Sequence, residues 1–166
     1  MPGPVAIGII DGYFEGTPSV WHKEILWALG QGITVFGAAS MGALRAAELD
    51  AFGMIGVGRT YEAYTSGEIE DDDEVALLHG PAEVGYPPLS LAMINARSTL
   101  QSALALNIIS TKEAEHLTST AKSQFYKSRS WESVLENIDP ETLPSERCSK
   151  LRDWFSANEI DQKRED

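Results

Sequence analysis

A serine set between small residues is the first sign of chemistry in this sequence. Ser40 stands in residues 38–42, Ala-Ala-Ser-Met-Gly, which match the G-x-S-x-G nucleophile elbow except for alanine at the first small position. In an elbow the backbone turns sharply from strand to helix, so small neighbours are needed and the serine hydroxyl projects above the sheet. The amide of Met41 and one amide from the loop near Gly12 would then bind an oxyanion. The pattern favours acyl transfer, and the alternative is a serine that only caps the following helix.

A nucleophilic serine needs a base, and the chain has three histidines. His22 is favoured because it lies near the start of a predicted helix, whereas His116 lies in mid-helix, as a surface residue would. His79 follows an acidic run, so Ser40, residues 73–74 and His79 repeat the chain order of α/β-hydrolases. The chain is too short for that complete fold, and we interpret the order as a coincidence. For His22 and His79 alike, the alternative is a purely structural role.

Two basic residues flank these candidates. Lys23 could serve as a desolvated base or as a cation that faces an anionic substrate. Arg45 lies one turn into the helix that follows Ser40, and its guanidinium could grip a carboxylate or thiocarboxylate. The alternative for Arg45 is an ion pair with Glu48 or Glu24.

These residues need a scaffold, and the first half of the chain predicts a parallel sheet. Short β-branched apolar runs alternate there with helical segments, which is typical of right-handed βαβ units. Residues 53–68 are rich in glycine and predict either a bend with a third short strand or a crossing between two helices. The preceding elements are predicted as strand 5–10, helix 18–29, strand 33–36 and helix 41–49.

The candidate residues lie where this topology would place a ligand. Ligands of open α/β sheets bind beyond the carboxyl ends of the parallel strands. Asp11 follows the first strand, Ser40 follows the second, and the first helix begins near His22 and Lys23. We therefore expect Asp11, His22, Lys23 and Ser40 to converge at one edge of the sheet.

The second half of the chain predicts helices alone. After Pro87-Pro88 the pattern becomes amphipathic, and a capping box opens at Ser110. We predict an α/β fold with a small parallel-sheet core over residues 1–86, followed by a helical extension over residues 87–166 that packs on that core. The polar tail from about residue 161 is expected to fray. The predicted helices are 89–106, 110–128, 131–138 and 145–158.

Composition narrows the class of protein. The formal net charge is −12, and residues 1–83 carry −10 of it, with three basic and thirteen acidic side chains. Such a chain is a poor ligand for nucleic acid. No apolar run could cross a membrane, no signal peptide is visible, and the single cysteine, Cys148, fits a reducing cytoplasm and offers no multi-cysteine metal site. The acidic run 68–74 is either a solvated loop or a docking surface for a basic partner.

Several longer motifs resemble one known family, the TfuA-like core domain. The resemblance runs from about residue 7 to about residue 100 and thins out over the helical half. Members of this family often carry more sequence ahead of the first strand, so this sheet is expected to lack an edge strand that its relatives have. The motifs that carry the resemblance are residues 10–14, 20–26, 36–49, 52–58 and 72–76.

The resemblance implies a role in sulfur supply. TfuA-like proteins occur beside YcaO enzymes, which activate a peptide amide with ATP, and together they make backbone thioamides in ribosomally made peptides. The family is thought to hydrolyse the C-terminal thiocarboxylate of a ThiS-like sulfur-carrier protein and so release sulfide for YcaO. The implied partners are therefore a YcaO enzyme, the carrier and the precursor peptide, and no cofactor is expected.

The resemblance also implies roles for single residues. Ser40 would be the nucleophile, His22 the base and His79 the reserve base, with Asp11 orienting or polarising His22. The residues expected to bind the anionic tail or the developing charge are Lys23, Arg45, Gly12 and Met41.

Two other interpretations stay open. The first is a non-catalytic activator or scaffold protein that binds YcaO. The second is a binder of nucleotide phosphate that uses residues 37–42 as an anion cradle, although no lysine follows these glycines as in a P-loop.

Overall fold

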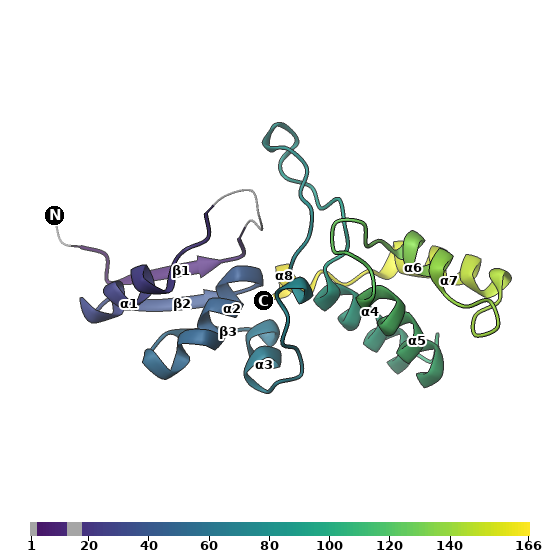
Figure 1. The fold of residues 1–166 in the computed structure, drawn as a ribbon, viewed down its shortest axis with the longest axis horizontal. Helices are drawn as coiled ribbons and strands as arrows, with labels where there is room; N and C mark the ends of the chain where they lie inside the picture. The colour runs from purple at the N-terminus through teal and green to yellow at the C-terminus, as the bar shows by residue number, and fades with distance from the viewer. Residues whose placement is uncertain (1–2, 13–17) are drawn as a thin grey trace. The chain divides into compact units, whose positions relative to one another are not determined.

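The structure is a computed structural model that describes residues 3–12 and 18–166 (Figure 1). It contains two compact units, Met1–Val75 with Gln162–Asp166, and Ala76–Asp161. The division falls after Val75, whereas composition placed it at residue 86, and the last five residues belong to the first unit. None of the helices in these described ranges is long and apolar enough to cross a membrane.

A three-stranded parallel sheet forms the centre of the first unit and confirms the predicted α/β fold. Its strands are β1 (Ala6–Ile10), β2 (Thr34–Ala38) and β3 (Ile55–Val57), in the order β1-β2-β3. Ile10 pairs with Ala38, and Ala38 pairs with Val57, so all three strands end at the same level. Residues 53–68 thus supply a third strand, the first of the two predicted alternatives.

Two helices of the first unit, α1 (His22–Gly30) and α2 (Ser40–Leu49), cover one face of the sheet, and α3 (Arg59–Thr65) follows β3. Successive right-handed crossovers in one direction place α1 and α2 on the same face, and both contribute to a single apolar cluster with β2. The buried members of this cluster are Ile25, Ala28, Val35, Ala46, Leu49 and Met54.

The first helix begins later than predicted. It starts at His22 and not at residue 18, with Trp21 as its N-cap. The Glu24 carboxylate accepts a hydrogen bond from the Trp21 amide at 2.8 Å. This bond satisfies a backbone N–H that would otherwise have no partner, and so favours a helix start at this point.

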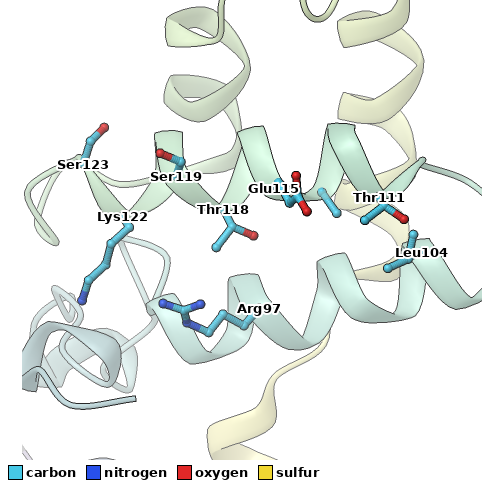
Figure 2. A pocket seen from close by; sticks show the side chains of 9 residues that line it. Arg97, Leu104, Thr111, Glu115, Thr118, Ser119, Lys122 and Ser123 are labelled. Carbon is cyan, nitrogen blue, oxygen red and sulfur yellow. The ribbon is translucent and has the colours of Figure 1, made fainter. Parts of the chain in front are cut away.

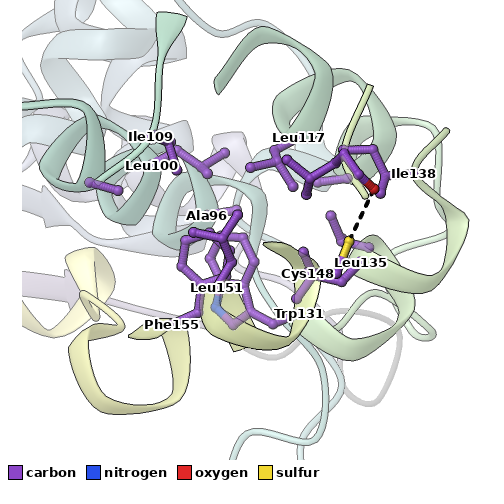
Figure 3. Packing of buried hydrophobic residues seen from close by; sticks show 14 of the residues in the cluster. Ala96, Leu100, Ile109, Leu117, Trp131, Leu135, Ile138, Cys148, Leu151 and Phe155 are labelled. Atoms are coloured by element: carbon purple, nitrogen blue, oxygen red, sulfur yellow. Dashed lines mark hydrogen bonds between the residues drawn. The ribbon is translucent and has the colours of Figure 1, made fainter. Parts of the chain in front are cut away.

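The second unit is helical, as predicted. Its helices are α4 (Met93–Ala105), α5 (Thr111–Lys122), α6 (Trp131–Asn137) and α7 (Ser145–Asn158). Their apolar faces form one core (Figure 3), in which the Trp131 and Phe155 rings stack with centroids 4.1 Å apart and the Cys148 thiol donates to the Leu143 carbonyl.

Helix α5 ends six residues earlier than predicted, because a buried arginine side chain donates hydrogen bonds to backbone carbonyls near the end of the helix. Arg129 is fully buried, and its Nε donates to the Ala121 carbonyl at 2.9 Å. Its Nη2 donates to the Gln124 carbonyl at 3.1 Å. A charged group is tolerated in such a core only when hydrogen bonds replace its lost hydration.

The prediction that the tail frays is wrong. Residues Gln162–Glu165 form helix α8, and Gln162 is buried. Asp166 Oδ1 accepts hydrogen bonds from the amides of Arg59 at 2.9 Å and Thr60 at 3.4 Å. A polar sequence is therefore ordered by hydrogen bonds to distant backbone, which composition does not reveal.

An ion pair between α5 and α7 makes the second unit sensitive to acid. Arg147 Nε donates to Glu113 Oε1 at 2.8 Å, and Ser110 donates to the same carboxylate. The Arg147 hydrogen bond is the main cause that lowers the pKa of Glu113 to about 2, against its ordinary 4.5. This stabilisation is present above the unfolded-state pKa and is lost as the pH falls toward 2.

We expect Glu113→Gln to destabilise the second unit by about 1–3 kcal/mol at neutral pH. The loss should shrink as the pH falls below about 4.5, because the wild-type carboxylate is then protonated in the unfolded state and stays ionised in the folded state until the pH nears 2. Urea unfolding followed by tryptophan fluorescence from pH 7 to pH 3 measures this. The matched control is Glu146→Gln, whose carboxylate is 84% exposed and pairs with Lys150. Equal losses for both variants would contradict the assignment.

Candidate functional site

Ser40 lies in a sharp, strained turn between β2 and α2. Ala39 has φ 50° and ψ 160°, and Ser40 has φ 28°, so two successive non-glycine residues have positive φ. Such conformations cost on the order of 1–3 kcal/mol each and persist only where the surroundings impose them. The N-cap position is occupied by Ala39, and α2 has no side-chain cap bond. Ser40 is therefore not the helix cap that the sequence left open as an alternative.

Two glycines allow this turn to sit close to the sheet. A Cβ at Gly42 would lie 2.1 Å from the Ile9 carbonyl oxygen, and one at Gly37 would lie 2.2 Å from the Gly42 carbonyl oxygen. The start of α2 is thus packed directly on β1 and β2. The small residues of the elbow pattern are needed here for steric reasons.

Gly12 and Met41 lie against each other. A Cβ at Gly12 would come within 2.5 Å of the Met41 Cβ. The structure therefore brings together the two residues whose amides were expected to serve an oxyanion.

The Ser40 hydroxyl is buried. Ser40 has no exposed surface, and its Oγ donates to the Val75 carbonyl at 3.3 Å. Glu74, the residue before Val75, is 2% exposed. The acidic run thus ends inside the unit, although most of it is solvated.

Glu74 also acts on a tyrosine of α3. Burial, and next the negative charge of Glu74, hold the pKa of Tyr64 well above its ordinary value of 10. The Tyr64 hydroxyl donates to the Asp71 carbonyl at 3.0 Å. Tyr64 therefore stays protonated and fastens the acidic run to α3.

Asp11, at the end of β1, pairs with a lysine from the end of the chain. Its backbone has φ 62°, and its amide donates to the Ala38 carbonyl at 3.1 Å. Its Oδ1 lies 3.1 Å from Lys163 Nζ, and the Lys163 side chain is only 7% exposed. A lysine this buried is stable as a cation only beside a compensating charge.

His22 belongs to a second cluster, on α1 and α2. Its Nε2 lies 2.7 Å from Glu48 Oε2, and Arg45 Nη1 donates to the same oxygen at 2.6 Å. Arg45 Nε also donates to the Val20 carbonyl at 3.1 Å. The Arg45–Glu48 pair considered above is therefore present. An open pocket of about 380 Å³ lies here, lined by Ser19, Trp21, His22, Lys23 and Arg45.

The expected convergence of four residues is only partial. Glu48 stands eight residues after Ser40, a rise of about 12 Å along α2, so His22 at Glu48 lies beyond hydrogen-bond reach of the Ser40 hydroxyl. Asp11 is nearer, because its amide bonds to Ala38, two residues before Ser40. Lys23 lines the His22 pocket. The four residues thus fall into two groups along α2.

His79 lies in the second unit. It forms an isolated bridge with Pro88, and its Nδ1 contacts the Tyr86 carbonyl oxygen at 3.2 Å. His116 is exposed on α5, as expected.

Comparison with models of known families shows to which family the chain belongs. The family model for TfuA-like protein matches residues 11–130, well over half of the chain. The chain belongs to the TfuA-like family. No curated protein matches it. Membership implies a role beside a YcaO enzyme, and the match includes Ser40 but ends before Lys163.

Sequence reasoning missed several residues around the candidate site. Lys163 and Asp166 reach the sheet edge from the chain's end, and no local pattern marks either residue. Glu48 was considered only as a partner of Arg45, yet it also binds His22. Its spacing of three from Arg45 on one helix was the available signal.

A second pocket in the described part of the chain is lined by none of the predicted site residues. It lies between α4 and α5, has a volume of about 690 Å³ and is mainly apolar (Figure 2). Arg97 and Lys122 extend toward one end of it. Within the described ranges, no group of three or more His, Cys, Asp or Glu side chains is placed to hold a metal ion.

Gly42→Ala should destabilise the first unit by at least about 2 kcal/mol, because the new methyl meets a backbone oxygen that cannot move alone. Gly30→Ala is the matched control, since nothing lies within 4 Å of the position that its new methyl would take. That variant should be neutral or more stable by up to about 1 kcal/mol. Amide hydrogen exchange in β1 and β2 measures both effects, and equal protection in the two variants would disprove the close approach.

Proposed function

We propose that this TfuA-like protein is a serine-type thiocarboxylate hydrolase. Its substrate would be the C-terminal thiocarboxylate of a ThiS-like sulfur-carrier protein, and its product would be sulfide for a YcaO enzyme that makes backbone thioamides. Family membership supports the YcaO association. The strained Ala39–Ser40 turn, held between Gly37 and Gly42, is the observation that carries the chemistry.

The proposed reaction has two acyl-transfer steps. Ser40 Oγ attacks the carbonyl carbon of the thiocarboxylate, the C–S bond breaks, and the serine proton leaves with the sulfur as HS⁻. Water then hydrolyses the acyl-serine ester, which frees the carrier carboxylate and restores the hydroxyl. Because the substrate is already an anion, attack gathers further negative charge on the carbonyl group. Amides near Gly12 and Met41 and the positive end of α2 would stabilise that charge.

Ser40 must leave its present partner before it can react. The bond to the Val75 carbonyl is 3.3 Å long, beyond the usual range for O–H···O bonds. Giving it up costs about 1 kcal/mol, which is small beside the barrier that such an enzyme lowers. Catalytic hydrogen bonds are often misaligned until substrate binds.

The geometry favours Asp11 over His22 as the proton acceptor for Ser40. Asp11 follows the strand beside β2, and its side chain is 45% exposed, although the Oδ1 atom that faces Lys163 is buried. His22 is engaged by Glu48 about two turns further along α2. In this scheme Arg45 attaches residues 19–20 to α2 through hydrogen bonds. Lys23 binds the anionic tail of the carrier protein.

One observation favours the non-catalytic alternative. Ser40 is fully buried and its hydroxyl is already satisfied by a backbone carbonyl, as in a structural serine. An activator or scaffold protein of YcaO would need nothing more from it.

Ser40→Ala should lower single-turnover release of sulfide from the carrier thiocarboxylate by at least about 10³-fold, measured without YcaO. The control is Ser156→Ala, which removes a hydroxyl that donates to the Arg152 carbonyl on α7. If neither wild type nor variant releases sulfide faster than buffer, while both support thioamidation by YcaO, the hydrolase proposal fails and the scaffold interpretation replaces it.

Asp11→Asn and His22→Gln separate the two candidate bases. With Asp11 as proton acceptor, Asp11→Asn should slow sulfide release about 10²–10⁴-fold, and His22→Gln should change it by less than about threefold. The same single-turnover assay gives both rates. The reverse ranking would return the role of base to His22.

A further inference from the structure

The last residues of the chain are attached to both outer strands of the sheet. Lys163 Nζ reaches Asp11, directly after β1. Asp166 Oδ1 accepts from the amides of Arg59 and Thr60, the first two residues of α3, which follows β3. Gln162 Nε2 donates to Asp166 Oδ1 at 3.0 Å and ties the two ends of the segment together.

The strand order then fixes the path of this segment. β2 lies between β1 and β3, and all three strands end at one level. Adjacent strands are about 4.8 Å apart, so Gln162–Asp166 spans the edge at which β2 ends and Ser40 begins α2. The segment belongs to the same compact unit as that edge.

Lys163 carries a positive charge on a side chain that is nearly buried. Its side chain is 7% exposed, whereas the Asp11 side chain is 45% exposed. The lysine is thus the more buried half of the pair, and the Asp11 side chain is partly exposed although its Oδ1, which faces the lysine, is buried. A buried cation in this position holds the carboxylate in one place.

We propose that Lys163 is a positioning residue of the sheet-edge site. It holds the Asp11 carboxylate, and with it the left-handed backbone at Asp11, in the orientation that serves Ser40. The inference rests on the proposed function for its catalytic consequence, and on the Asp11–Lys163 geometry for its structural one. Residues far beyond the family match would then complete the site.

Lys163→Met should slow single-turnover sulfide release by about 10–100-fold, as expected when a catalytic group is displaced by about an ångström. Affinity for the carrier in its ordinary carboxylate form, measured by fluorescence anisotropy, should change less than about threefold, because Lys163 acts through Asp11. Lys163→Arg keeps the charge and should recover most of the rate. Arg164→Met removes the same charge from an exposed neighbour and should behave as wild type.

A double variant tests the coupling. If Lys163 acts only through Asp11, then Asp11→Asn combined with Lys163→Met should be no slower than Asp11→Asn alone. An additive loss would overturn the positioning role. An unchanged rate in Lys163→Met would also overturn it, and a faster rate would identify the segment as a cover that competes with the carrier tail.

Amide hydrogen exchange tests whether Lys163 positions Asp11 without measuring sulfide release. Lys163→Met should speed exchange of the Asp11 amide, which donates to Ala38, at least about tenfold, while Arg164→Met should not. If wild type releases no sulfide, the hydrolase proposal fails, and this exchange result still decides whether Lys163 positions Asp11. Unchanged exchange would overturn the inference even in an active protein.

Discussion

The start of helix α2 lies so close to the sheet that no side chain fits between them, and the rest of the first unit depends on this contact. Gly42 meets β1, and Gly37 on β2 meets the Gly42 carbonyl. With the helix held this near, the chain has no room for a loop between β2 and α2. The whole turn must therefore be made by Ala39 and Ser40, and this forces both to positive φ.

The turn between β3 and α3 provides an internal comparison. β3 also passes directly into a helix, and the residue at that turn, Gly58, has φ 91° and ψ 169°. Ala39 has nearly the same ψ of 160°, at φ 50°. Glycine adopts such a conformation without strain, whereas alanine does not. Of these two turns, only the one that carries Ser40 is therefore strained.

Sequence patterns predicted the elements that local chemistry determines. β1, β2 and α2 follow from β-branched runs and from small residues at the turn, and Ser40 was located by the same pattern. The long-range parts could not be found in this way. Lys163 and Asp166 lie in a polar tail, and their order comes from Asp11 and from the Arg59 amide, more than a hundred residues away.

The expected convergence at the sheet edge shows the same limit more sharply. Topology correctly brought Asp11 and Ser40 to adjacent strand ends, because the ends of parallel strands are fixed by register. It could not place His22, because the position of a side chain at the first turn of α1 depends on what that turn packs against. Arg45 holds the Val20 carbonyl, so the turn is drawn along α2 toward Glu48.

The buried cations of the two units have different kinds of partner. Arg129 is fully buried, and its guanidinium donates hydrogen bonds to backbone carbonyls of its own unit. These bonds stabilise the C-terminal end of α5. Lys163 is nearly as buried, yet its partner Asp11 is half open to solvent. Taking a charge out of water is costly, and the ion pair with Asp11 offsets that cost for Lys163. The Asp11 carboxylate is thus held by a nearly buried cation beside the strained turn that carries Ser40, as the proposed role of Asp11 requires.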